Sequence, residues 1–319
     1  WMLAATATLM LVMRHGLGGS FPARRRWISA AAVSCLSLWL LAEWNLAASL
    51  PASTVLRIDM LDVGNGTCHI VRSGGESLLW DCGTLSTAGS RSRIVAAARA
   101  LGVACAPTAV ITHPDLDHFG AVLDLARPLG LRRVLVPRRF LDDARRHPRG
   151  AAATALDGLA SRGVDVVCVK AGDRLQIGET TLEFLSPSDD ASFDADNDHS
   201  LVARFTADRF GTRPMLLLTG DVQDAAIESL ETAFPSLDPI AVEVPHHGSA
   251  RKAAVDWVCD QLAPSIVLQS TGLRRLDDPR WDRARADRTW LCTASDGACW
   301  VRFEQGGRTL HGSFRADVP

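Results

Sequence analysis

His113, Asp115, Asp117 and His118 stand within six residues of this 319-residue chain. The apolar run over 108–111 directly before them is typical of a buried strand, so the four side chains are expected at a strand end. Carboxylate oxygens and imidazole nitrogens are ligands of divalent cations, and a bound cation stabilises their deprotonated forms at neutral pH. The spacing therefore predicts a metal site in the loop after this strand.

Three later segments also place ligand-type side chains at the ends of expected strands. The apolar runs over 215–218 and 240–244 are followed by Thr-Gly-Asp and Pro-His-His-Gly-Ser, and a polar loop ending in Asn-Asp-His-Ser precedes the run over 201–205. Strand ends of this kind assemble a site at a sheet edge from distant parts of a chain. The candidates that these segments add are Asp198, His199, Asp221, His246 and His247.

Apolar runs and helical patterns alternate along the chain and must position these residues. Helices are expected over 94–101, 119–129, 156–161 and 222–233, and further strands over 55–62, 67–71, 77–81, 164–169 and 181–185. The strand over 77–81 ends in Asp81, a carboxylate that either orients a neighbouring loop or belongs to an ordinary turn. This alternation predicts an α/β domain.

The first 50 residues differ from the remainder and are expected to form a membrane segment. Residues 1–12 carry no charge, residues 13–26 hold four arginines, and residues 27–50 carry only Glu43. About 20 apolar residues cross about 30 Å of hydrocarbon, so one or two transmembrane helices are expected over 1–50. A signal-like or amphipathic anchor, or a core helix, is the alternative. Because an arginine-rich loop stays cytoplasmic, a globular domain over 51–319 would face the periplasm or the exterior.

The charge of the chain limits the partners that it can bind. With a formal net charge of −2 and a pI near 6.5, the chain is not a general nucleic-acid binder, so contact with a polyanion must come from a basic patch or from metal ions. Seven arginines lie between 132 and 149; Arg138 and Arg139 are candidates for phosphate contact, a solvated charged face being the alternative. The eight cysteines include no CxxC pair, so no zinc ribbon is legible.

Six short motifs occur in one order across residues 55 to about 270. They resemble those of the metallo-β-lactamase superfamily, and most closely those of the soluble domain of ComEC-type DNA-uptake (competence) proteins. The motifs are LDVGNG at 61–66, LLWDCG at 78–83, THPDLDH at 112–118, NDHSLV at 197–202, LLTGDV at 217–222 and VPHHGS at 244–249.

The resemblance implies an α/β fold in the form of a four-layer αββα sandwich, with two divalent cations, zinc or manganese, at the edge between its two sheets. His113 and Asp115 would bind one cation, Asp117 and His118 would bind the other, and Asp221 would bridge them.

The remaining ligands are implied less directly. His246 is preferred over His247 for completing the second site, because it comes first after the strand. The third ligand of the first site lies among Asn197, Asp198 and His199, and the sequence does not choose between them.

The leading hypothesis is metal-dependent phosphodiester hydrolysis of the DNase type. Two cations about 3.5 to 4 Å apart neutralise both oxygens of an in-line displacement at phosphorus. The resemblance implies that Asp117, Asp221 and His246 are catalytic and that Asp81 and Ser249 steady the ligand loops. The substrate would be single-stranded DNA held through its backbone, at the inner membrane of a bacterium and alongside other competence proteins.

Two alternatives remain. One is a metallo-hydrolase of a small ester or phosphoester, since the fold hosts many hydrolases. The other is a catalytically degraded, membrane-tethered DNA-binding domain. This second alternative is favoured by Asp278, which with Pro279 stands where ComEC-type chains usually carry a His-Pro pair.

Overall fold

The chain divides into two units, residues 1–49 and residues 50–319. The computed structural model describes residues 31–39, 49–85 and 89–314. Within the described part of the first unit, residues 31–39 are helical, and no described helix of the chain is long and apolar enough to cross a membrane. Most of the predicted transmembrane helices fall on residues outside the described part, namely 1–30 and 40–48.

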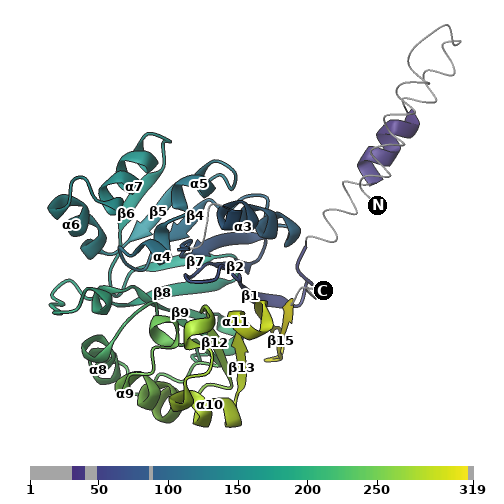
Figure 1. The fold of residues 1–319 in the computed structure, drawn as a ribbon. Helices are drawn as coiled ribbons and strands as arrows, with labels where there is room; N and C mark the ends of the chain where they lie inside the picture. Colours follow the sequence, from purple (N-terminus) through teal and green to yellow (C-terminus); the bar gives the residue numbers. More distant parts are fainter. Residues whose placement is uncertain (1–30, 40–48, 86–88, 315–319) are drawn as a thin grey trace, which may run out of the picture. The chain divides into compact units, whose positions relative to one another are not determined.

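The second unit is built on two β-sheets that face each other (Figure 1). The eight strands of the first sheet are, in spatial order, β15 (Thr309–Phe314), β14 (Ala298–Glu304), β1 (Thr54–Met60), β2 (His69–Ser73), β3 (Glu76–Trp80), β4 (Thr108–Val110), β5 (Arg133–Val136) and β6 (Asp165–Cys168). The seven strands of the second sheet are β13 (Thr289–Cys292), β12 (Ile266–Gln269), β11 (Ala241–Glu243), β10 (Leu216–Leu218), β9 (Val202–Thr206), β8 (Thr180–Ser186) and β7 (Arg174–Ile177).

Parallel pairing within each sheet brings the candidate residues to one edge. Strands β3 to β6 run parallel to one another in the first sheet, and β10 to β13 do so in the second. The carboxyl ends of parallel strands meet at the same edge of a sheet. The loops after β3, β4, β10, β11 and β12 therefore lie beside one another.

Alternation along the strands explains why their sequences are apolar on both faces. In β3, Leu78 and Trp80 belong to the core between the sheets, whereas Leu79 belongs to the core on the outer face. In β10, Leu216 and Leu217 divide in the same way. Successive side chains point to opposite faces, so a strand covered on both sides must be apolar throughout.

Helices cover the outer face of each sheet and complete four layers (Figure 1). The helices on the first sheet are α3 (Gly89–Ala100), α5 (Val122–Ala126), α6 (Arg138–Arg146) and α7 (Ala151–Ala160). Those on the second are α8 (Asp224–Ala233), α9 (Lys252–Asp256) and α10 (Asp282–Asp287). This is the αββα order of layers that the motifs implied.

The segment 119–129, expected as one helix, forms two. Helix α4 (Leu116–Phe119) contains His118, and α5 begins only at Val122. The break arises because the Ala121 backbone N–H donates to the Cys82 carbonyl, 2.9 Å away in the neighbouring strand-end loop, and not to the preceding turn. The loop after β4, residues 112–118, here called the ligand loop, is thus tied to the loop after β3.

The sequence patterns also missed several strands. Strands β5, β7 and every strand after residue 250 were not expected, although Cys299, Val301 and Phe303 of β14 alternate into the inner core. Strand β14 pairs antiparallel with β1 and extends the first sheet, while β12 supplies a further strand end to the site edge.

Glycine is required at residue 83, where the chain passes the ligand loop. A Cβ at Gly83 would lie 1.9 Å from the Asp117 carbonyl carbon and 2.1 Å from the His118 nitrogen. The neighbouring Cys82 N–H donates to the His118 carbonyl at 2.8 Å, which holds the two backbones at this separation. No side chain larger than hydrogen fits there without displacing the loop.

Replacing Gly83 by alanine is expected to destabilise the domain by about 3 kcal/mol, the upper range for overpacking, because backbone atoms must move. Gly75→Ala is the control: its Cβ enters open space at a φ of +86°. It should cost only about 1 kcal/mol for the left-handed backbone. Urea unfolding of both variants checks this, and equal stabilities would contradict the steric account.

Candidate metal centre

Asp81 holds the two ends of the ligand loop. It is fully buried with a φ of +53°, so its side chain turns back toward the loop after β4. Its carboxylate accepts hydrogen bonds from the backbone N–H and the hydroxyl of Thr112, both at 2.8 Å, and lies 2.7 Å from Nδ1 of His118. A carboxylate that accepts a hydrogen bond from Nδ1–H leaves Nε2 of the imidazole directed at the site.

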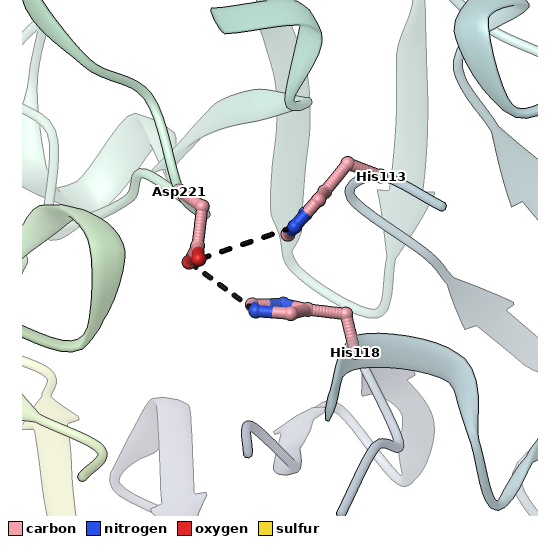
Figure 2. Close-up of side chains that lie close together, drawn as sticks. All are labelled: His113, His118 and Asp221. Atoms are coloured by element: carbon pink, nitrogen blue, oxygen red, sulfur yellow. Dashed lines mark ion pairs between the residues drawn. The ribbon is translucent and has the colours of Figure 1, made fainter. Parts of the chain in front are cut away.

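His113, His118 and Asp221 form the first group of convergent ligand atoms (Figure 2). Nε2 of His118 lies 3.2 Å from Oδ1 of Asp221, and Nε2 of His113 lies 3.9 Å from Oδ2 of the same carboxylate. The three ligand atoms lie within 4.8 Å of one another, and all three residues are buried. The loops after β4 and β10, which the sequence analysis expected to share a site, meet here.

Asp117, His118 and His247 form the second group. Nε2 of His247 lies 3.3 Å from Oδ2 of Asp117 and 3.1 Å from Nε2 of His118. Nδ1–H of His247 donates a hydrogen bond to the Ser270 carbonyl at 3.0 Å, which leaves Nε2 facing the site. His118 belongs to both groups, so the two groups adjoin.

His247, and not His246, is placed to complete the second group, which differs from the expectation. Both residues have left-handed backbones, with φ of 51° and 54°, so the chain coils between them and both Nε2 atoms face Oδ2 of Asp221, that of His247 at 3.6 Å. Nε2 of His246 lies 3.7 Å from Oδ2 of Asp221, and its Nδ1 lies 3.2 Å from the Gln223 side-chain nitrogen. Order along the chain was a poor guide because it ignores this coiling.

Asp115 and Ser249 lie at the margins of the site. Oδ2 of Asp115 is 3.5 Å from Nε2 of His113, and its side chain is 53% exposed, so it stands at the rim of the first group. The Ser249 backbone N–H donates to the His246 carbonyl at 2.9 Å and closes the turn Pro245–Gly248, here called the histidine turn.

Asp198 and His199 are not brought into either group. Oδ1 of Asp198 accepts hydrogen bonds from the backbone N–H groups of Gln223 at 2.6 Å and Ala226 at 3.3 Å, so this carboxylate caps the start of α8. Nε2 of His199 lies 3.0 Å from the Phe193 carbonyl. The polar loop thus serves helix α8 and its own packing.

Glu243 and His69 form a buried pair that the sequence analysis missed, and Glu243 holds the backbone directly before Asp221. Oε1 of Glu243 on β11 lies 2.6 Å from Nε2 of His69 on β2, and both residues are buried. Oε2 of Glu243 accepts from the N–H groups of Thr219 at 3.2 Å and Gly220 at 3.3 Å, directly before Asp221. The sequence feature that could have revealed this pair is Glu243 itself, a charged residue inside the apolar run 240–244.

The site carries strongly shifted pKa values. Burial raises the pKa of Asp221, but the imidazoles of His118, His247 and His113 outweigh it and hold the pKa well below its usual range. Burial lowers the pKa of His118, yet the Asp221 and Asp81 carboxylates raise it well above its ordinary value. Burial likewise opposes the hydrogen bond from His247 that brings the pKa of Asp117 down to about 2. Without a cation, protons on the imidazoles balance the carboxylates.

The residues present fit a divalent cation. Nε2 of His113 is buried and has no hydrogen-bond partner among the described residues, although it points toward Asp221. Buried polar atoms are rarely left unpaired, so an orphaned imidazole nitrogen beside a carboxylate indicates a missing partner of positive charge. Mixed imidazole and carboxylate donors suit zinc and, with more oxygen ligands, manganese.

Residues 61–188 match the family described as the metallo-beta-lactamase superfamily. The chain carries a metallo-beta-lactamase domain. The matched part of this domain contains Asp81 and the loop 113–118, whereas Asp221 and the histidine pair lie beyond it. The resemblance stated from the motifs is confirmed, and this fold typically binds divalent metal ions.

Two curated relatives of the domain are ComEC-type competence proteins, as the motifs predicted. ComE operon protein 3 of Bacillus subtilis (strain 168) is 26% identical over 232 residues, covering 67% of this chain and 28% of the relative. Competence protein ComA of Neisseria gonorrhoeae is 26% identical over 273 residues, covering 85% of this chain and 33% of the relative. The chain spans about a third of the length of these relatives.

Solved structures share the fold of the metallo-beta-lactamase domain. The metallo-beta-lactamase fold protein YhfI from Bacillus subtilis has a TM-score of 0.50 at 12% identity, covering 81% of this chain and 100% of that one. Zn(2+)-bound PqqB from Methylobacterium extorquens has a TM-score of 0.51 at 11% identity, covering 80% of this chain and 99% of that one. At these identities the likeness concerns the fold alone.

Asp81→Asn is expected to weaken zinc binding by about 10- to 100-fold, because the neutral amide no longer holds His118 by its Nδ1 proton. The exposed Asp62, which accepts from the Gly64 N–H at 3.2 Å, gives the control Asp62→Asn. Competition with a chelating dye measures both affinities. Wild-type affinity in the Asp81 variant would contradict this role.

The pH dependence of stability is expected to change sign with metal. In the metal-free protein, the raised pKa values of His118 and His247 give stability that is complete below about pH 6.5 and is lost as pH rises through them. The lowered pKa of Asp117 gives stability that is lost only as pH falls toward about 2. Zinc needs deprotonated imidazoles, so the rise in Tm on adding zinc should grow with pH. Thermal scans on both sides of neutrality measure this, and a metal-free Tm that does not fall at alkaline pH would contradict it.

Proposed function

We propose that this metallo-beta-lactamase domain is a metal-dependent phosphodiester hydrolase that cleaves DNA as part of a DNA-uptake protein. The observation that carries the proposal is that the two adjoining ligand groups meet at His118 and at the Asp221 carboxylate. Two cations held side by side there would neutralise both the attacking and the leaving oxygen at a phosphorus atom. The competence proteins among the relatives support DNA as the substrate.

The side chains of the centre divide the work between holding cations and moving a proton. Because Nδ1 of His118 faces Asp81, its free Nε2 can bind one cation only. His118 would hold that cation with Asp117 and His247, His113 would hold the other, and the two oxygens of Asp221 would bind both. Their orientations are set before any ligand binds, which reduces the reorganisation needed in the reaction.

His246 is the proposed proton carrier. Burial lowers its pKa, Asp221 raises it and Arg275 lowers it further, so the pKa lies below its ordinary value and the ring is neutral at pH 7. Its Nε2, 3.7 Å from Oδ2 of Asp221, is the atom that would accept a proton beside the reacting phosphate.

A polar hollow beside the same sheet edge supports contact with a DNA backbone. It has a volume of about 410 Å³, and its charged lining residues are Arg138, Arg139 and Lys170 together with Asp142, Asp173 and Asp189. Arg139 pairs with Asp196. Arg138 is 75% exposed, and its Nε lies 3.7 Å from Oδ2 of Asp142. Strands β5 and β6 end here, next to β4, so phosphates leaving the metal centre would reach Arg138 and Arg139 without base-specific contacts.

The degraded-site alternative depended on Asp278, whose position the structure accounts for. Its carboxylate caps the short helix η6 (Pro279–Trp281), accepting from the Arg280 backbone at 3.1 Å and from its side chain at 2.6 Å. This residue serves local structure, and its identity removes no ligand from either group. Attachment to the bacterial inner membrane, with the domain on the periplasmic or extracellular side, remains part of the proposal.

Cleavage of single-stranded DNA by residues 51–319 with manganese or zinc is the direct test. Asp117→Ala is expected to lower the rate at least about 100-fold, because it removes a ligand and its charge from one cation site. Asp238→Ala, at an exposed carboxylate paired with Arg213, is the control and should cleave at the wild-type rate. Inactivity with every metal, or full activity of the Asp117 variant, would contradict the proposed function.

A further inference from the structure

An arginine that no motif predicted stands beside the metal centre. Arg275 ends the short helix η5 (Leu273–Arg275), which follows β12, and its side chain is half-buried. Nη1 donates to the His246 carbonyl, and Nη2 lies 3.5 Å from Nε2 of His246. Because that same Nε2 lies 3.7 Å from Oδ2 of Asp221, the guanidinium adjoins the face of the first ligand group.

Its position is fixed by a buried amide. Gln269 at the end of β12 is fully buried, and its side-chain nitrogen donates both to the Arg275 carbonyl at 3.1 Å and to the His247 carbonyl at 3.2 Å. The oxygen of the same amide accepts from the Trp290 indole N–H at 2.9 Å. Arg275 and the histidine turn are thus held by one side chain and keep a constant relation.

Arg275 is half-buried and yet has no carboxylate partner among the described residues. Arg280 pairs with Asp278 and Arg283 pairs with Asp260, whereas Arg275 makes no ion pair with any described residue. Burial lowers the pKa of Arg275, and Asp221 and Asp117 act on it only from a distance to raise it. A half-buried cation without an anion is costly unless a ligand supplies one.

We propose that Arg275 binds the non-bridging oxygens of the phosphate that reacts at the metal centre, and thereby selects phosphoesters over uncharged carboxylic esters. The inference rests on the proposed function. A guanidinium has five N–H donors in a planar fork that matches phosphate, and Nη1 spends one of its donors on the His246 carbonyl. The donors that remain lie beside His246, where the phosphate would have to sit to meet the cations.

A purely structural role makes a different prediction. If Arg275 only braces the histidine turn through the His246 carbonyl, its loss disturbs zinc binding and stability and leaves phosphate affinity of the loaded protein unchanged. Arg275→Gln keeps an N–H donor for that carbonyl and removes the charge. Arg274→Gln is the matched control, because Arg274 is exposed and precedes Arg275 in the same helix.

The test uses the full 319-residue chain loaded with zinc and inorganic phosphate as the probe. Calorimetry should give a phosphate Kd about 10- to 100-fold weaker in Arg275→Gln, the range for loss of a charge-assisted hydrogen bond, with zinc content and Tm unchanged. The Arg274 variant should bind as the wild type does. Wild-type phosphate affinity in Arg275→Gln, or lost zinc and lowered Tm with phosphate affinity intact, would overturn the proposal.

Two further measurements keep the inference separate from folding and from the proposed function. On the unmutated chain, phosphate should slow phenylglyoxal labelling of Arg275 and not of Arg274, as read by peptide mass spectrometry. An Arg275 labelling rate that is the same with and without phosphate would overturn the proposal without any variant. With bis(p-nitrophenyl) phosphate as substrate, Arg275→Gln should raise KM more than it lowers kcat. A wild-type chain that hydrolyses no phosphodiester would sink the proposed function, while the phosphate Kd and the labelling still decide the role of Arg275.

Discussion

The contact between Asp81 and His118 is the interaction on which the rest of the centre depends. Three donors converge on one buried carboxylate: the Thr112 N–H, the Thr112 hydroxyl and the His118 ring, 2.7 Å away. An isolated carboxylate in such a place would be costly, but one with its lone pairs satisfied is rigid and sets the orientation of every group that it touches. It fixes the start and the end of the ligand loop at once, and Gly83 lets the strand that carries Asp81 approach closely enough to do so.

In the second sheet, too, a buried carboxylate holds the backbone that carries a ligand residue. Glu243, paired with His69 across the gap between the sheets, holds the backbone before Asp221, and the Leu201 N–H donates to the Thr112 carbonyl at 3.0 Å. These links couple the two sheet edges, so the Asp221 carboxylate meets His113 and His118 without either loop being long. Short loops on a doubly covered sheet lose little conformational freedom on folding, which suits a site that must hold its ligands in place.

The histidine turn shows what such a site costs. Two successive non-glycine residues in the left-handed region are unfavourable by roughly 1–2 kcal/mol each. The turn persists because its surroundings hold it: the Gln269 amide bonds the His247 carbonyl, and Arg275 bonds that of His246. The result is that both imidazoles face Asp221 while Nε2 of His247 also reaches Asp117, whereas adjacent residues of an extended strand point to opposite faces.

The sequence by itself determined which chemistry was available and where along the chain it would appear. The sequence indicated four of the ligand candidates because each follows an apolar run, namely His113, Asp117, His118 and Asp221. A short run that is apolar on both faces is typical of a strand in the middle of a covered sheet. The four layers and a supporting role for Asp81 were expected from the resemblance of the six motifs to the metallo-β-lactamase superfamily. Only the tertiary structure decided that His247 faces Asp117, that Asp198 caps a helix, that β14 lies between β15 and β1 in the first sheet and that Arg275 stands beside His246. The physical reason is that these outcomes depend on backbone turns and on hydrogen bonds between residues far apart in sequence. Local composition determines a strand and the side chain at its end, but the direction in which that side chain points is set by the neighbours that packing brings to it.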